Sequence, residues 1–159
     1  MKQYIDVDCG DCKLCCRFSY LSGQWLTLNE AEVEFGFNTE LCDTYFLKKD
    51  DYYFVDEFCI QYKNNKCSIH EKPQLPITCG LYPFFIVEDN KKRQYLAIDK
   101  NCPCWKKLVL KEIINIISAK AVELQKCYSA MGREKIYTMK TLKMFGYRIK
   151  KIKQIDFVS

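Results

Sequence analysis

Four cysteines close to the start of the chain constrain its structure more than any other feature. Cys9, Cys12, Cys15 and Cys16 fall within eight residues and form a CxxCxxCC run. Gaps of two residues let a tight loop turn successive thiolates toward one metal centre. Adjacent side chains on an extended chain point to opposite sides, so Cys15 and Cys16 do not fit easily on one tetrahedral ion. We therefore expect one of the pair to serve a second ion, to bridge two ions or to reach another part of a cluster.

The composition of the whole chain favours a thiolate site inside the cell. There are 11 cysteines but only one histidine, His70. An odd number of cysteines, with no apolar signal segment after Met1, argues against an extracellular disulfide framework and predicts a cytoplasmic protein. Reduced thiols in such number are better explained as metal ligands. Sites of four thiolates are typical of structural zinc and of iron–sulfur clusters, which weakens a hydrolase interpretation.

Length and charge predict one main domain with a basic extension. With 159 residues, of which 48% are hydrophobic, the chain can bury a core of its own. Residues 131–159 contain eight basic and two acidic side chains, a net charge of +6 in a chain whose total is +5. We therefore predict a cysteine-cluster metal-binding domain at residues 1–131 and a basic C-terminal extension at residues 132–159. No membrane span is expected, because the longest charge-free piece of the late apolar segment, residues 113–119, is far too short.

The hydrophobic pattern predicts a small cysteine-rich α+β domain with short antiparallel strands. Strands are expected at residues 52–55, in a hairpin formed by residues 58–62 and 66–69, and in a pair near residues 82–87 and 95–98. Thr27 and Glu30 form a capping box, which predicts a short helix that ends before Gly36. A second short helix is expected around residues 39–47, and a single helical turn at residues 78–81.

One long helix near the C-terminus is predicted to be the packing partner of the core. Between Trp105 and Met131, apolar residues recur at spacings of one, three and four, and Gly132 follows as a helix stop. Residues 138–145 are predicted to form another helix. Residues 147–157 alternate lysine with isoleucine, and this pattern fits either a strand or a basic amphipathic element.

The order of the cysteines resembles that of one protein family. The CxxCxxCC run is followed by Cys59 and Cys67, then by Cys67-Ser-Ile-His-Glu-Lys-Pro73, Cys79-Gly-Leu-Tyr-Pro-Phe84 and Cys102-Pro103. This order resembles the YkgJ-type cysteine-cluster proteins, the family of the CxxCxxCC zinc- or iron-chelating domain, over residues 9–104. The resemblance implies eight thiolate ligands, enough for two sites of four: Cys9, Cys12, Cys15, Cys16, Cys59, Cys67, Cys79 and Cys102. The other three cysteines, Cys42, Cys104 and Cys127, carry no family match.

Three positions depart from the family pattern. One is Gly80, which follows Cys79 where the family often has a basic residue. Lys72 precedes Pro73 where the family often has arginine, so a bidentate hydrogen-bonding partner is lost. His70 stands where the family often has tyrosine. We interpret His70 as a partly buried aromatic substitute in preference to an extra ligand or proton donor.

The resemblance leaves the metal and the activity open. Thiolates bind zinc and iron alike, but the family includes flagellin lysine methylases that are associated with an iron–sulfur cluster. We therefore expect an iron–sulfur cluster, such as 4Fe–4S, slightly in preference to zinc. The first functional hypothesis is a metal-binding protein with a redox or carrier role. The alternatives are a zinc-stapled interaction module whose basic tail binds nucleic acid or protein, and a methyltransferase-like enzyme. The catalytic residues of such an enzyme are unknown, since the chain has no phosphate loop, GxGxxG motif or Ser/His/Asp set.

Overall fold

The computed structural model describes residues 27–28, 46–49, 52–55, 59, 61–64, 66–132 and 136–156. At residues 27–28, 46–49, 52–55 and 62, only the backbone is considered. The CxxCxxCC run lies outside the described residues, as does most of the two short helices predicted before residue 47. The described part of the chain is α+β, as the sequence predicts.

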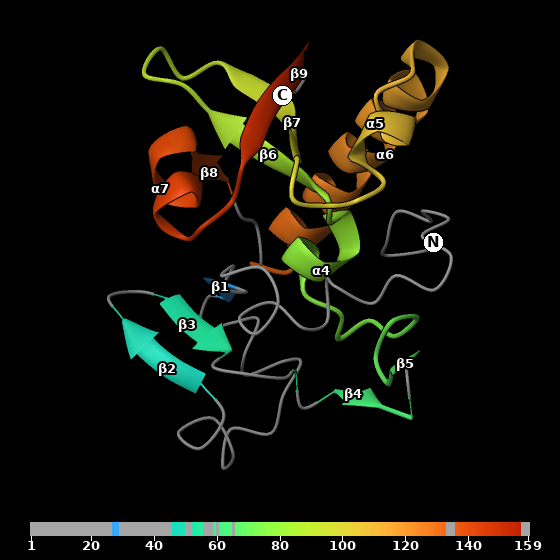
Figure 1. Cartoon of the computed structure of the whole chain (residues 1–159), viewed down its shortest axis with the longest axis vertical. Helices are drawn as coiled ribbons and strands as arrows, with labels where there is room; N and C mark the ends of the chain where they lie inside the picture. Colours follow the sequence, from blue (N-terminus) through green and yellow to red (C-terminus); the bar gives the residue numbers. More distant parts are fainter. Residues whose placement is uncertain are drawn as a thin grey trace.

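The described strands form three sheets (Figure 1). Strands β1 (Thr27–Leu28), β3 (Tyr52–Val55) and β2 (Phe46–Lys49) make an antiparallel sheet in that order, and β4 (Tyr62–Lys63) pairs with β5 (Lys66–Cys67). The largest sheet has the order β8 (Tyr137–Thr138), β6 (Phe84–Glu88), β7 (Gln94–Asp99) and β9 (Ile149–Ile155). Its pairs are antiparallel except for β6 with β8. The described helices are α4 (Ile77–Leu81), α5 (Trp105–Leu108), α6 (Lys111–Ala130) and α7 (Met139–Met144).

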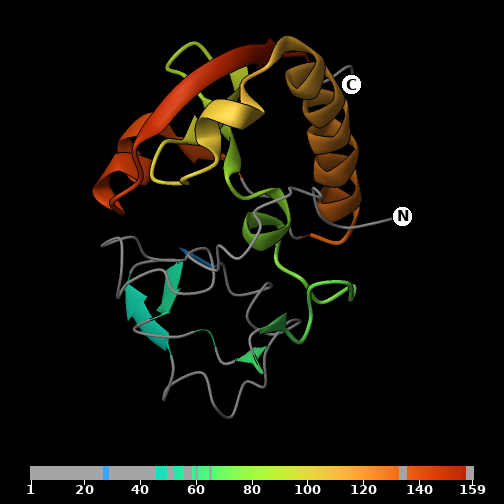
Figure 2. The same ribbon diagram turned by 45° about the vertical axis from the view of Figure 1, so that its right-hand side comes forward.

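The largest sheet is covered by helices on both faces. Alternate residues of β6 point to opposite faces, so Phe84 and Ile86 pack with α6 while Phe85 and Val87 pack with α7. This explains why β6 is a continuous apolar run and not an alternating one. Figures 1 and 2 show α6 and α7 on either side of the sheet, with α4 below it, followed by β4, β5 and the small β1–β3 sheet.

Strand β9 completes this sheet and contains a bulge. Ile155 pairs with Gln94 and Ile149 pairs with Asp99, but a register shift in between leaves Ile152 as an extra residue. Because an inserted residue reverses the alternation, Ile149 packs on the α7 side while Ile152 and Ile155 pack on the α6 side. Both described strands after residue 132, β8 and β9, therefore belong to one sheet with β6 and β7. Of the alternatives for residues 147–157, the strand is confirmed.

The predicted long helix is interrupted. It ends as α5 at Leu108 and begins again as α6, with Leu110 in an extended conformation between them. At about 3.6 residues per turn, a continuous helix would place Leu108 half a turn away from Ile117. Both residues are buried in the same core cluster, so the break lets two short apolar faces contact one sheet. The prediction of a single helix from Trp105 was wrong in this respect.

Of the two helices predicted before residue 47, the structure describes only one end each, and both of these ends are strands. Leu28 lies in β1, so no helix begins there, and Phe46 and Leu47 lie in β2. Their pairing with β3 outweighs the weak local preference for helix. The strands at residues 52–55, 84–88 and 94–99, the β4–β5 hairpin and the helical turn α4 confirm the remaining pattern.

Glycines end the last two helices, as predicted. Gly132 after α6 and Gly146 after α7 have φ values of +67° and +85°, in the left-handed region that glycine adopts without steric cost. At the start of α7, the side chain of Thr138 accepts a hydrogen bond of 3.1 Å from the backbone N–H of Thr141. Within the described residues, none of the helices has both the length and the apolar character needed to cross a bilayer.

Truncating the buried face of α6 should destabilise the protein far more than truncating its outer face. Leu124 is completely buried against the sheet, whereas Ile116 on the same helix is 70% exposed. Leu124→Ala is expected to lower the free energy of unfolding by about 2–5 kcal/mol, because it leaves a cavity. The control Ile116→Ala should change it by less than about 0.5 kcal/mol. Urea unfolding measures both, and equal losses would contradict this packing.

Candidate metal centre

Helix α4 carries Cys79 and is fixed by side chains from distant segments. Tyr128 of α6 donates a hydrogen bond to the carbonyl oxygen of Leu75, just before α4. The hydroxyl group of Thr78, within α4, lies 3.0 Å from that of Tyr137 in β8, and the two share a hydrogen bond. The half-buried thiol of Cys79 therefore projects from a backbone that both α6 and β8 hold in place.

Cys102 lies in the turn between β7 and α5 and is only 4% exposed. Its backbone N–H donates to the carbonyl oxygen of Asp99 at 3.2 Å, and its carbonyl oxygen accepts from the N–H of Trp105 at 3.1 Å. The side-chain amide of Asn101 donates to the carbonyl oxygen of Gly146 at 3.0 Å. The turn is thus hydrogen-bonded both along the chain and to the segment before β9.

The completely buried carboxylate of Asp99 lies between these two thiol-bearing segments. One oxygen, Oδ2, accepts a hydrogen bond of 3.0 Å from the hydroxyl of Tyr82, just after α4. The other, Oδ1, accepts from the backbone N–H of Asn101 at 3.1 Å and of Arg148 at 3.0 Å. Three hydrogen bonds offset the cost of removing this carboxylate from water.

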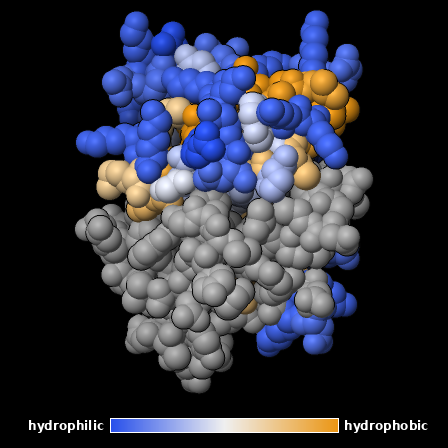
Figure 3. All heavy atoms as spheres, viewed as in Figure 1, coloured by the Kyte–Doolittle hydropathy of each residue, from blue (hydrophilic) through white to orange (hydrophobic). Residues whose placement is uncertain are grey.

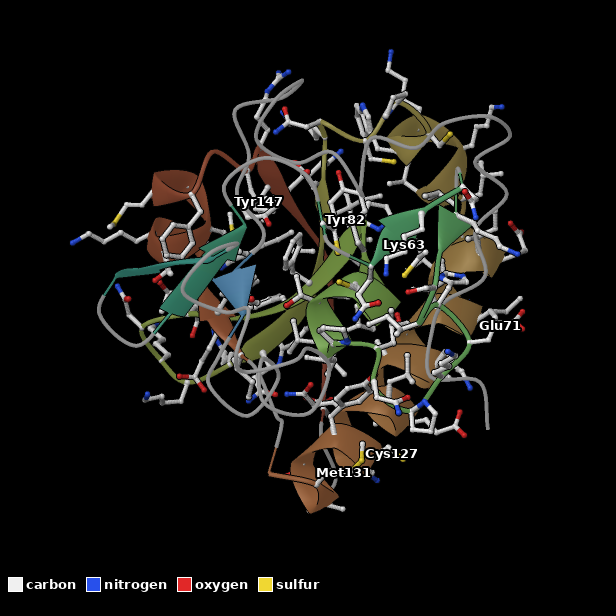
Figure 4. The ribbon with its side chains drawn as sticks, turned by 90° about the horizontal axis from the view of Figure 1, so that it is seen from below. Lys63, Glu71, Tyr82, Cys127, Met131 and Tyr147 are labelled. Atoms are coloured by element: carbon white, nitrogen blue, oxygen red, sulfur yellow. The ribbon has the colours of Figure 1, made fainter. Side chains whose placement is uncertain are left out.

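Tyr82 and Tyr147 link this group to the two thiols. Burial, then the nearby charges of Asp99 and Cys102, raise the pKa of Tyr82 far above its usual value. Burial also raises the pKa of Tyr147, with further contributions from Tyr137, Asp99 and Cys79. Cys102 thus contributes to the raised pKa of Tyr82, and Cys79 contributes to that of Tyr147. Figure 4 shows the two tyrosines on the same side of the molecule.

The β4–β5 hairpin holds the other two described ligand candidates. Cys67 is in β5, opposite Tyr62, while Cys59 lies two residues before Gln61 on the other arm. Asn64 in the turn has a φ of +51°, and Ser68 bonds to Gln61 through both its backbone N–H and its hydroxyl. The hairpin places one half-buried thiol on each arm, but the two thiols are not opposite one another in the register.

The described thiols do not make a complete metal site by themselves. Among the residues that the structure describes, no three Cys, His, Asp or Glu side chains come close enough together to hold one metal ion. A site of four thiolates would therefore need ligands from other parts of the chain. Thiolates are suitable ligands for zinc and for iron, and Cys79 and Cys102 are partly or fully shielded from water.

Two of the cysteines without a family match, Cys104 and Cys127, are described. Cys127 is half-buried on α6, far from Tyr82 and Tyr147 (Figure 4). Cys104 packs against the core on the α6 side of the sheet. His70 is exposed, so the interpretation of this residue as a partly buried aromatic was wrong. Lys72 is exposed as well.

The sequence analysis did not single out Asp99 or Tyr147. The sequence feature that could have pointed to Asp99 is its position directly after the apolar run Tyr95-Leu-Ala-Ile98. An acid there fits a solvated strand end equally well, and its partner Arg148 is 49 residues away. Tyr147 had no local signal, because its contact with Phe85, at a ring-centroid distance of 4.9 Å, depends on the fold.

Burial of Tyr147 should make the protein less stable at alkaline pH. The folded state raises the pKa of Tyr147, so the unfolded chain loses this proton first as the pH passes about 10. Below that pH the contribution to stability is complete; above it, about 1.4 kcal/mol is lost per pH unit. Tyr147→Phe should flatten this decline, whereas Tyr95→Phe, at a half-buried position of β7, is the control. Urea unfolding between pH 8 and 11 measures both, and identical slopes in the wild type and Tyr147→Phe would contradict the assignment.

Comparison with known proteins identifies the family. The family model "CxxCxxCC: Putative zinc- or iron-chelating domain" matches residues 8–103, which is more than half of the chain. Neither the curated proteins nor the solved structures contain a match. The matched range contains Asp99, Tyr82 and all eight cysteines of the expected ligand set. The chain therefore belongs to the family of the CxxCxxCC zinc- or iron-chelating domain.

Proposed function

We propose that this protein uses eight cysteine thiolates to hold more than one metal atom, and that the metal centre is an iron–sulfur cluster in preference to zinc. The proposed ligands are Cys9, Cys12, Cys15, Cys16, Cys59, Cys67, Cys79 and Cys102. The observation that best supports the proposal is that Cys79 and Cys102, from separate elements, flank one buried hydrogen-bonded group. The family contributes the class of function, chelation of zinc or iron.

In this proposal, the CxxCxxCC run supplies the ligands that the described residues lack. The described thiols do not form a group of three, and Cys9, Cys12, Cys15 and Cys16 are the remaining cysteines of the proposed set. The last two are adjacent in sequence and cannot comfortably share one tetrahedral ion. This supports a centre with more than one metal atom.

The choice of an iron–sulfur cluster fits the surroundings of the thiols. Cys102 is buried, as is Asp99 in the same turn, and Asp99 accepts a hydrogen bond from Tyr82. Shielding from water and hydrogen bonding near the ligands tune the reduction potential of an iron–sulfur cluster. A bound cluster would supply electron transfer, while the protein would hold and shield it. Zinc in the same place would form a structural site that stabilises the fold.

Replacing proposed ligands by serine should lower the metal content. Cys12→Ser, Cys79→Ser and Cys102→Ser are each expected to reduce the metal bound per chain, because each removes a thiolate. Cys127→Ser is the matched control and should leave the metal content unchanged. Elemental analysis of full-length protein purified without oxygen measures all four variants. If Cys127→Ser loses as much metal as the other three, the ligand assignment is wrong.

We also propose a second function, binding of single-stranded nucleic acid, which a basic surface along β9 supports. The Nζ atoms of Lys150 and Lys106 lie 5.7 Å and 6.0 Å from the centre of the Trp105 ring, and that of Lys151 lies 4.3 Å from the ring of Tyr95. In Figure 3, hydrophilic residues make up much of the upper part of the molecule, beside a hydrophobic patch at the upper right. Lysines neutralise phosphates, and aromatic rings stack with bases. Lysines on an edge strand also discourage pairing with another sheet, and that structural role alone predicts no binding.

Reversing the charge on β9 should abolish this binding. The double variant Lys150→Glu/Lys151→Glu is expected to bind a labelled oligouridine at least about tenfold more weakly, because phosphate contacts dominate such affinity. Lys140→Glu/Lys143→Glu on α7 makes the same change of charge on exposed residues and is the control. Fluorescence anisotropy at low and moderate salt measures the binding. Equal losses in both variants, or no binding by the wild type at low salt, would reject this second function.

A further inference from the structure

The hydrogen bonds of Asp99 have a consequence for the metal ligands. Its three donors come from three different segments: the Tyr82 hydroxyl after α4, the Asn101 N–H in the turn after β7, and the Arg148 N–H before β9. Both carboxylate oxygens are used and the residue is completely buried. A buried group with this many partners fixes the relative positions of the segments that it joins.

Two of these segments carry proposed ligands. Tyr82 is bonded through its backbone N–H to the carbonyl oxygen of Thr78 at 3.1 Å, in the same helical turn as Cys79. Asn101 directly precedes Cys102, whose own N–H donates to the carbonyl oxygen of Asp99. The side chain of Asp99 therefore helps to set the distance between the backbones that carry the two thiols, together with the β6–β7 pairing and the bond of 2.9 Å from the Asp99 N–H to the carbonyl oxygen of Pro83.

The third segment is the start of β9. Besides the bond from the Arg148 N–H to Asp99, the backbone N–H of Lys100 donates to the carbonyl oxygen of Arg148 at 2.9 Å. The turn that carries Cys102 is thus bonded to a strand that begins almost 50 residues later.

We infer that Asp99 is a positioning residue for the metal centre: it holds Cys79 and Cys102 in place and ties both to β9. This inference rests on the proposed function. Residues that orient metal ligands from outside the coordination sphere typically change metal affinity by about 10–100-fold when they are replaced. Because the coupling is reciprocal, bound metal should in turn stabilise the start of β9.

The chain offers a closely matched control. Asp89, in the β6–β7 hairpin at the other end of the same strands, accepts backbone hydrogen bonds from Lys91 at 2.8 Å and Arg93 at 3.0 Å, and a side-chain bond from Arg93 at 2.9 Å. With a further bond of 3.4 Å from the Tyr95 hydroxyl, it anchors a turn with at least as many hydrogen bonds as Asp99, but far along the strands from Cys102. Loss of hydrogen bonds alone would affect both aspartates, whereas loss of ligand positioning would affect only Asp99.

The test measures the zinc affinity of full-length variants by competition with a chromophoric chelator. Asp99→Ala should bind zinc at least about tenfold more weakly than the wild type, and Asp89→Ala should bind as the wild type does. Asp99→Asn should recover most of the affinity, because its amide keeps the volume and can still bond to Tyr82 and to both N–H groups. Tyr82→Phe, which loses only one of the bonds, should fall between the wild type and Asp99→Ala.

A second measurement needs no variant and decides the case if Asp99→Ala does not fold. Removing metal from the wild type should speed hydrogen exchange at the backbone amides of Asn101 and Arg148, but not at those of Lys91 and Arg93. Equal zinc affinity in Asp99→Ala and the wild type, or metal-independent exchange at Arg148, would overturn the inference. A wild type that binds no metal at all would instead reject the proposed function.

Discussion

The buried carboxylate of Asp99 is the interaction on which the described structure depends most. An isolated carboxylate would be costly to remove from water, and three hydrogen bonds offset that cost. These bonds join α4, the turn after β7 and the start of β9, which are far apart in sequence. The sheet, the second ligand-bearing turn and the C-terminal strand therefore form one unit. The C-terminal region carries a net charge of +6, and its isoleucines Ile149, Ile152 and Ile155 lie in the core or pack against it.

Much of the fold could be predicted because local patterns and final environments agree. The apolar run of β6, the polar turn before β5 and the glycines after α6 and α7 each have one physical interpretation. The rest depended on tertiary pairing. Leu108 and Ile117 both fit the helical spacing of apolar residues between Trp105 and Met131. A continuous helix would nevertheless point them in opposite directions, and only a break lets both reach the sheet. Ile149, Ile152 and Ile155 fit a helix as well as a strand, and the bulge against β7 decides between them.

The chemistry of the candidate site could be predicted from the sequence, but the residue that holds its backbone segments together could not. Cysteine spacing and the family pattern predict thiolate ligands, and the predicted set includes Cys79 and Cys102. Neither spacing nor composition reveals that a carboxylate will hold the two backbones together. Asp99 could equally have ended a solvated strand, and only the folded chain brings Arg148 to it. Residues that orient ligands act through geometry, which local sequence does not encode.

The measurement that tests the central claim most directly is the content of iron, zinc and acid-labile sulfide per chain. It requires full-length protein, expressed with added iron and purified without oxygen, together with its visible spectrum. A thiolate centre of the proposed kind predicts brown protein with more than one iron atom per chain and sulfide in similar amount. Folded protein with a single metal atom per chain, or with zinc and neither iron nor sulfide, would contradict it.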